Sequence, residues 1–167
     1  QFHSNSISDF LEFINHADYV CGHNILNHDL IHIERVASFD FAEVKTIDTL
    51  FLSPLLFPIK PYHALLKDDK LQTDELNNPL NDAVKAKDLF FDEVSAFNEL
   101  DSDLKQIYSS LLEDKKEFSS FFSYINCPAF KGDIKELIQK RFSGEICQYI
   151  QLDKLTMENA IELAYCL

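Results

Sequence analysis

The chain has 167 residues, the length of one domain or of one domain with an appendage. Hydrophobic residues make up 46% of it, enough to fill a core, which excludes a low-complexity or disordered chain. The net charge of −13 argues against a nonspecific nucleic-acid coat, because phosphates repel such a surface. It does not exclude a nuclease, since carboxylates that hold divalent metal ions are acidic themselves.

The ends of the chain and its cysteines bear on location. The opening QFHSNSISDF has no basic region followed by an apolar one, so it is no secretory signal, and it has no initiator methionine. The final AYCL stops within a helical pattern, and we therefore expect a piece of a longer protein. The apolar runs are too short to cross a bilayer, so we expect no membrane partner and a cytoplasmic location. No cysteine pair has zinc-site spacing, and we expect four core thiols: Cys21, Cys127, Cys147 and Cys166.

The first predicted elements form a strand–turn–helix unit. Residues 4–16 have the apolar spacing of an amphipathic helix, and residues 17–21 are typical of a buried strand. Gly22 breaks the strand, and residues 26–37 resume a helical period. Asp29 is therefore expected on about the first turn of that helix.

A second strand is predicted at residues 43–47, followed by Asp48-Thr49-Leu50 as a turn into a short helix. Three prolines then indicate a loop or a broken helix: Pro54, Pro58 and Pro61. The sequence NNPLN indicates a turn, and from Pro79 a helical pattern extends into the mid-nineties.

The remainder is predicted to be helical. Apolar faces recur in four segments: 104–112, 118–125, 134–142 and 156–167, the last with Thr156 as a possible cap. The change from mixed to helical pattern comes near residue 95. We therefore expect one part at residues 1–95 and a helical connector at residues 96–167.

The stretch GHNILNHDL, residues 22–30, places histidine, asparagine and aspartate side chains directly after the first predicted strand. It resembles the second motif of the DEDD exonucleases, the DnaQ-like branch of the ribonuclease H-like fold. The resemblance implies that His23 and Asn24 shape the strand-end turn and that Asp29 binds catalytic metal. His28 is a mild departure from the aromatic residue that the family more often has there. The alternative is a plain turn, with Asn24 as the helix N-cap and Asp29 as a solvated helix residue.

The segment from Tyr62 to Phe90 matches the family's closing H-x4-D motif in two ways. His63 and Asp68 have the literal spacing, whereas Asp82 opens a helix as the family's aspartate does, with Asn77 in the place of the histidine. We prefer Asp82 as the metal ligand, because helical context is harder to reach by chance than one spacing. His63 is then the candidate general base, and Asp68 the alternative ligand. The competing interpretation makes His63 a loop histidine that packs beside Tyr62.

The resemblance implies an α/β fold: a partial ribonuclease H-like (DnaQ-like exonuclease) core followed by an all-helical extension. The implied chemistry is two-metal hydrolysis of a phosphodiester, with Mg²⁺ or Mn²⁺ ions about 4 Å apart. In the family, two of the four metal-binding carboxylates belong to a D-x-E motif on the first strand of the sheet. That motif lies well upstream of the position that Gly22, His23 and Asn24 occupy here. Only twenty-one residues precede Gly22, and Asp9 and Glu12 have the wrong spacing in a helical pattern. The chain thus has half of the expected ligands and would leave a sheet edge uncovered.

The string from His63 to Phe90 and the tail SGEICQYIQLDKLTMENAIELAYCL resemble exonuclease-like domains fused ahead of RecQ-type helicases in bacteria. The resemblance implies a metal-dependent 3′–5′ exonuclease domain of a larger DNA-processing protein, which we expect to be inactive as this piece. The implied partners are DNA in preference to RNA, a helicase domain of the same protein, and a second copy at the uncovered sheet edge. The alternative function is a non-catalytic exonuclease-like module that supports a helicase.

Overall fold

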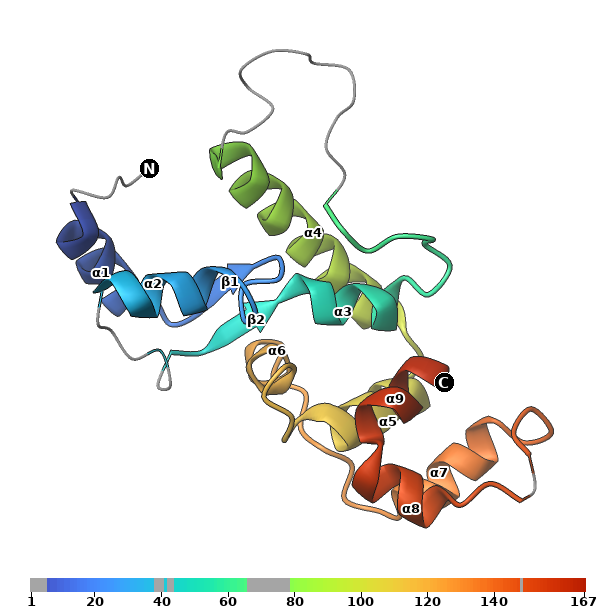
Figure 1. The fold of residues 1–167 in the computed structure, drawn as a ribbon. Coiled ribbons are helices and arrows are strands. Elements are labelled where there is room, and N and C mark those ends of the chain that lie inside the picture. The colour runs from blue at the N-terminus through green and yellow to red at the C-terminus, as the bar shows by residue number, and fades with distance from the viewer. Residues whose placement is uncertain (1–5, 38–40, 42–43, 66–78, 148) are drawn as a thin grey trace.

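A computed structural model describes residues 6–37, 41, 44–65, 79–147 and 149–167, and these residues form a mixed but mostly helical fold (Figure 1). The first part contains α1 (Ile7–Asn15), β1 (Val20–Gly22), α2 (Asp29–Ala37), β2 (Thr46–Asp48) and α3 (Thr49–Leu56). The long helix α4 (Pro79–Glu99) leads to the second part. That part contains α5 (Ser102–Leu112), α6 (Ser119–Tyr124), α7 (Ile134–Arg141), α8 (Leu152–Glu158) and α9 (Ala160–Cys166).

The two described strands pair in parallel, with Val20 opposite Thr46 and Gly22 opposite Asp48. Each begins about three residues later than the sequence pattern predicts. Helix α2 connects them, as a parallel pair requires. Every residue of β2 is buried, whereas Cys21 in β1 is exposed. Within the described residues β2 is thus the inner strand of the pair, and β1 pairs only with β2.

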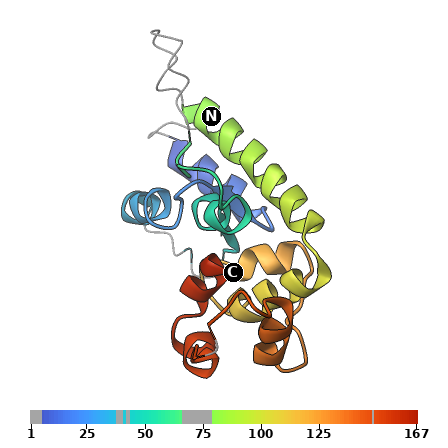
Figure 2. The ribbon, with the colours of Figure 1, turned by 90° about the vertical axis from the view of Figure 1, so that its right-hand side faces the viewer.

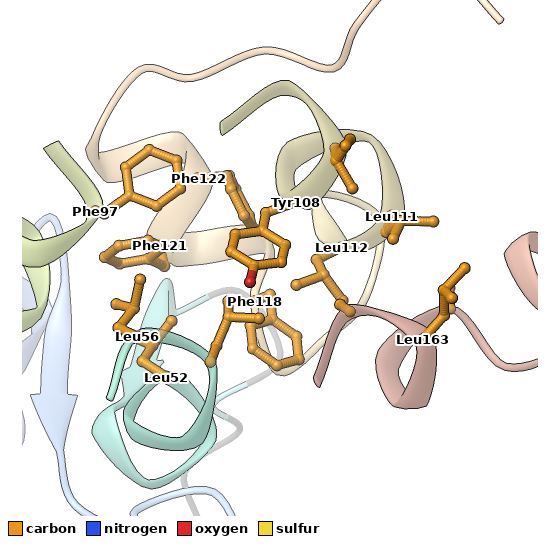
Figure 3. Close-up of a cluster of buried hydrophobic side chains, with 14 of the residues drawn as sticks. Leu52, Leu56, Phe97, Tyr108, Leu111, Leu112, Phe118, Phe121, Phe122 and Leu163 are labelled. Carbon is orange, nitrogen blue, oxygen red and sulfur yellow. The ribbon is translucent and has the colours of Figure 1, made fainter. Parts of the chain in front are cut away.

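One apolar core joins the two parts of the chain. It contains side chains of β2, α3 and α4 together with side chains of every helix from α5 to α9. Figure 3 shows part of this core, with labelled side chains from α3, α4, α5, α6 and α9. Its centre is rich in aromatic rings that meet edge to face, such as Phe97 against Phe121 and Phe122. The expected division at residue 95 falls inside α4, so the two parts share both a helix and a core.

The arrangement of the helices is clear in two perpendicular views. Helix α4 runs along one side of the molecule, and α5 to α9 gather at the end where α4 finishes (Figures 1 and 2). The last helix, α9, returns to α3, where the Tyr165 hydroxyl donates to the Phe51 carbonyl at 2.9 Å. At the other end, α1 and α2 pack through a smaller apolar cluster around Ile14 and Leu30.

Four sequence expectations need correction. The predicted helix at residues 156–167 is two helices, because the backbone departs from helical angles at Asn159, with φ −136° and ψ 42°. Thr156 lies inside α8, where its hydroxyl donates to the Leu152 carbonyl at 2.8 Å, so it caps nothing. Pro54 lies inside α3 and does not break it. The cysteines are not core thiols: Cys127 is half-buried and the other three are exposed.

No helix in the part of the chain that the structure describes is both long and apolar enough to cross a membrane.

Candidate active site

The strand-end turn begins with a glycine that the packing requires. A Cβ atom added to Gly22 would lie 2.9 Å from the Cβ of Ile25, closer than two carbon atoms can approach. Asn24 then takes a left-handed backbone conformation with φ 59°, which asparagine tolerates better than most residues. The turn closes when the His28 N–H donates to the Asn24 carbonyl at 3.0 Å. Asn24 is therefore the bend of the turn, whereas the alternative interpretation made it a helix cap.

Asp48 holds this turn against the end of the neighbouring strand. Its carboxylate accepts the backbone N–H groups of Asn24 at 2.7 Å and Leu26 at 3.1 Å. It also accepts the Leu50 N–H at 3.0 Å and so caps α3. The side chain is fully buried, and charge-assisted bonds in such a dry place are strong. One carboxylate therefore fixes three segments: the turn, the end of β2 and the start of α3.

His23 is oriented by the first residue of α3. Its Nδ1 lies 2.9 Å from the Thr49 hydroxyl oxygen, and that hydroxyl donates to the Gly22 carbonyl at 3.4 Å. With its proton used in this way, the Thr49 hydroxyl accepts from Nδ1–H, which selects one imidazole tautomer. Burial lowers the pKa of His23, and the nearby Asp48 charge opposes that shift. The ring is thus held in its neutral form at neutral pH.

Asp29 occupies the first turn of α2, as predicted. Its side chain is 54% exposed, and one oxygen lies 3.6 Å from Nδ1 of His28. The His28 ring in turn meets His32 edge to face, with centroids 4.9 Å apart. A carboxylate at a helix N-terminus is stabilised by the helix dipole and remains open to solvent here. Asp29 is therefore accessible to a cation or to a second protein segment.

The two other predicted site residues come from different elements. Asp82 lies on the first turn of α4 and is exposed. His63 lies in the loop after α3, half-buried, with Nδ1 2.9 Å from the Ser53 hydroxyl oxygen. Asp68, the alternative ligand, and Asn77 lie outside the described residues. The choice between the two H-x4-D alignments therefore stays a prediction.

Within residues 6–37, 41, 44–65, 79–147 and 149–167, no three histidine, cysteine or acidic side chains come together as a metal site. Asp29 and Asp82 stand on separate helices, and the buried Asp48 is occupied by three amide donors. The described residues do not by themselves fit a two-metal centre. No catalytic step through a metal ion follows from this geometry.

A second buried acid was not among the predicted site residues. Glu93 on α4 is fully buried, and among the residues that the structure describes neither of its carboxyl oxygens has a hydrogen-bond partner. Burial raises the pKa of Glu93 to about 9, against the smaller opposing effect of the Lys60 charge. Its spacing was the available signal, because it falls on the same helical stripe as Phe90 and Phe97. In the sequence a glutamate in a charged helix looks like a solvated residue, so the signal was overlooked.

No family model matches the chain, and no curated protein and no solved structure matches it either.

Proposed function

We propose that this chain is an exonuclease-like module of a larger DNA-processing protein. It would contribute part of a metal-dependent 3′–5′ phosphodiesterase site and would have no activity alone. The observation that carries the proposal is the strand-end turn at residues 22–28, which hydrogen bonds to Asp48 and within the turn hold in one conformation. There Gly22 ends one of two parallel strands, His23 and Asn24 follow it, and Asp29 opens the next helix. Residues that resemble the family motif thus occupy the strand–turn–helix context that the motif requires.

In this proposal Asp29 and Asp82 would each supply a carboxylate to Mg²⁺ or Mn²⁺, and His63 would be the general base. The remaining ligands would come from a D-x-E motif elsewhere in the longer protein. A ribonuclease H-like core would then be completed by strands that pair with β1, and the helical part would connect to a helicase domain. DNA is the proposed substrate.

The test compares the longer protein with three variants, using a 5′-labelled single-stranded DNA and Mn²⁺. We expect nucleotide release, and we expect Asp29→Asn and Asp82→Asn each to reduce it at least a hundredfold. Asp88→Asn is the matched control, because Asp88 is an exposed carboxylate on the same helix as Asp82 and pairs with Lys87 at 3.1 Å. Nuclease activity that survives both ligand substitutions would refute the assignment of the site.

A non-catalytic docking module is the second candidate. The observation that favours it is the state of the acids beside the turn. Asp48 already accepts three backbone N–H groups, and Glu93 is enclosed with a raised pKa. Neither is available to a metal ion. If the longer protein binds DNA or its helicase domain but releases no nucleotide, and no upstream D-x-E is present, the docking module is supported instead.

A further inference from the structure

Glu93 occupies an apolar position of α4. The buried residues of this helix are Ala86, Phe90, Glu93 and Phe97, at spacings of four, three and four. That spacing marks one face of a helix, and this helix packs against β1 and α3. Apolar side chains are expected at every position of such a buried stripe, but position 93 is a glutamate.

The described surroundings of the carboxyl group offer it no hydrogen bond. Both oxygens are inaccessible to water, and neither has a hydrogen-bond partner in the described part of the chain. Asp48, at the end of β2, is equally buried but has three N–H donors. Two buried acids therefore lie near each other. Three backbone N–H groups stabilise the charge of Asp48, whereas no described group donates a hydrogen bond to Glu93. A carboxylate without donors is costly in a dry environment, so the form of Glu93 that fits the packed helix is the neutral acid.

The charged and titratable groups around Glu93 favour the same form on balance. Burial has the largest effect on the Glu93 pKa, and the charges of Asp48 and Asp92 also raise it. Lys60, in the loop after α3, lowers it but does not bond to either oxygen. The Cys21 thiol of β1 is another titratable group here: burial raises its pKa to about 12, and the charges of Glu93 and Asp48 add to that shift. The folded acid thus keeps its proton up to a pH of about 9.

We propose that Glu93 is a proton-operated latch: while it carries its proton α4 stays packed on β1 and α3, and when the proton passes to solvent α4 loosens from both. Release would also relax the strand-end turn, because Asp48 holds that turn next to the same junction. The latch concerns the packing of α4 and of the turn beside it, and it does not depend on any nuclease activity.

The sign of the pH dependence follows from linkage. In the unfolded chain the carboxyl ionises near its ordinary pKa of 4.5, whereas the folded chain keeps it neutral to about 9. The stabilising contribution is therefore complete below pH 4.5 and is lost as the pH rises toward 9. Between these limits one coupled proton changes the unfolding equilibrium constant by up to about tenfold per pH unit.

The experiment measures urea unfolding of the full chain, followed by circular dichroism at several pH values. Three proteins are compared: the unaltered chain, Glu93→Gln and the control Asp92→Asn. Glutamine has the same shape and cannot ionise, and Asp92 is an exposed acid next to Glu93. We expect Glu93→Gln to gain stability over the unaltered chain progressively as the pH rises from 5 to 9. The control should follow the unaltered chain.

Hydrogen exchange localises the effect. Protection factors corrected for intrinsic rates should fall in α4 and in the turn of the unaltered chain between pH 6 and pH 9, and not in Glu93→Gln. Protection of α5 should not change. Glu93→Met, which fills the stripe with an apolar side chain, should behave as Glu93→Gln does and covers the case in which the amide fails to fold. Equal pH dependence in the unaltered chain and both variants, or a Glu93 carboxyl ¹³C signal that titrates near 4.5, would overturn the proposal.

Discussion

Asp48→Asn is the substitution to which the strand-end turn should be most sensitive. Asparagine preserves the shape of the side chain, but it has one acceptor oxygen and an NH₂ group that donates. If the oxygen keeps the bonds of Oδ1 to Asn24 and Leu50, the NH₂ group faces the Leu26 N–H, donor against donor.

The energetic cost can be worked out from these three contacts. Each retained bond changes from charge-assisted to neutral, a loss of about 1 kcal/mol apiece. The Leu26 N–H loses its partner in a buried place, which costs about 1–3 kcal/mol more. The sum is about 3–5 kcal/mol, a large share of the roughly 5–15 kcal/mol that stabilises a domain. Very few substitutions that preserve side-chain shape cost so much.

The assay is equilibrium unfolding in urea, with the helical signal as the measure of folded protein. Asp133→Asn is the matched control, because Asp133 accepts the Lys135 N–H at 2.8 Å and caps α7 from an exposed position. Asparagine is an equally good cap there, so we expect a loss of no more than about 0.5 kcal/mol. If Asp48→Asn costs no more than this control, Asp48 does not hold the turn and the reasoning is refuted.

Two further substitutions test the local chemistry. Gly22→Ala should lower the free energy of unfolding by about 1–3 kcal/mol, because the new Cβ meets the Ile25 Cβ at 2.9 Å; an unchanged urea midpoint would show that the turn has room. Asp101→Ala should cost about 1 kcal/mol at pH 7, since it removes the cap on the Leu104 N–H and the Arg141 partner. The Arg141 hydrogen bond, followed by the Leu104 N–H, holds the pKa of Asp101 below its ordinary 3.8, so this stabilisation should persist above that pH and disappear as the pH falls further. If the free energies of unfolding of Asp101→Ala and of the unaltered chain still differ at pH 2, the expected pH dependence is contradicted.

The strand–turn–helix unit was predictable because its signals are local. A short apolar run, a glycine and then a helical period suffice to place Asp29 on the first turn of α2, and the structure confirms that position. The bounds of β1 were shifted because the strand has only three residues, too few for a period to define its ends. The division near residue 95 was drawn where the composition changes, whereas helix α4 continues across it.

The other differences depend on tertiary contacts. Glu93 is buried because α4 packs against β1 and α3. Its spacing matches the stripe of Phe90 and Phe97, but its residue type is that of the solvated acids around it. The break at Asn159 divides a segment whose apolar spacing continues without interruption, so periodicity alone predicts one helix. Cys166 lies in a helix with buried neighbours but on its exposed side. For Glu93 the packing partners β1 and α3, which lie far along the chain, decide the outcome.

The most direct test of the proposed half-site uses the 167-residue chain itself, incubated with Mn²⁺ and a 5′-labelled single-stranded DNA. Asp29→Asn, Asp82→Asn and the control Asp88→Asn are assayed beside it. We expect no degradation by the unaltered chain above the level of either ligand variant, because the described residues assemble no metal site. Degradation that Asp29→Asn and Asp82→Asn abolish and Asp88→Asn leaves intact would contradict this account, since the chain or a second copy of it would then complete the site.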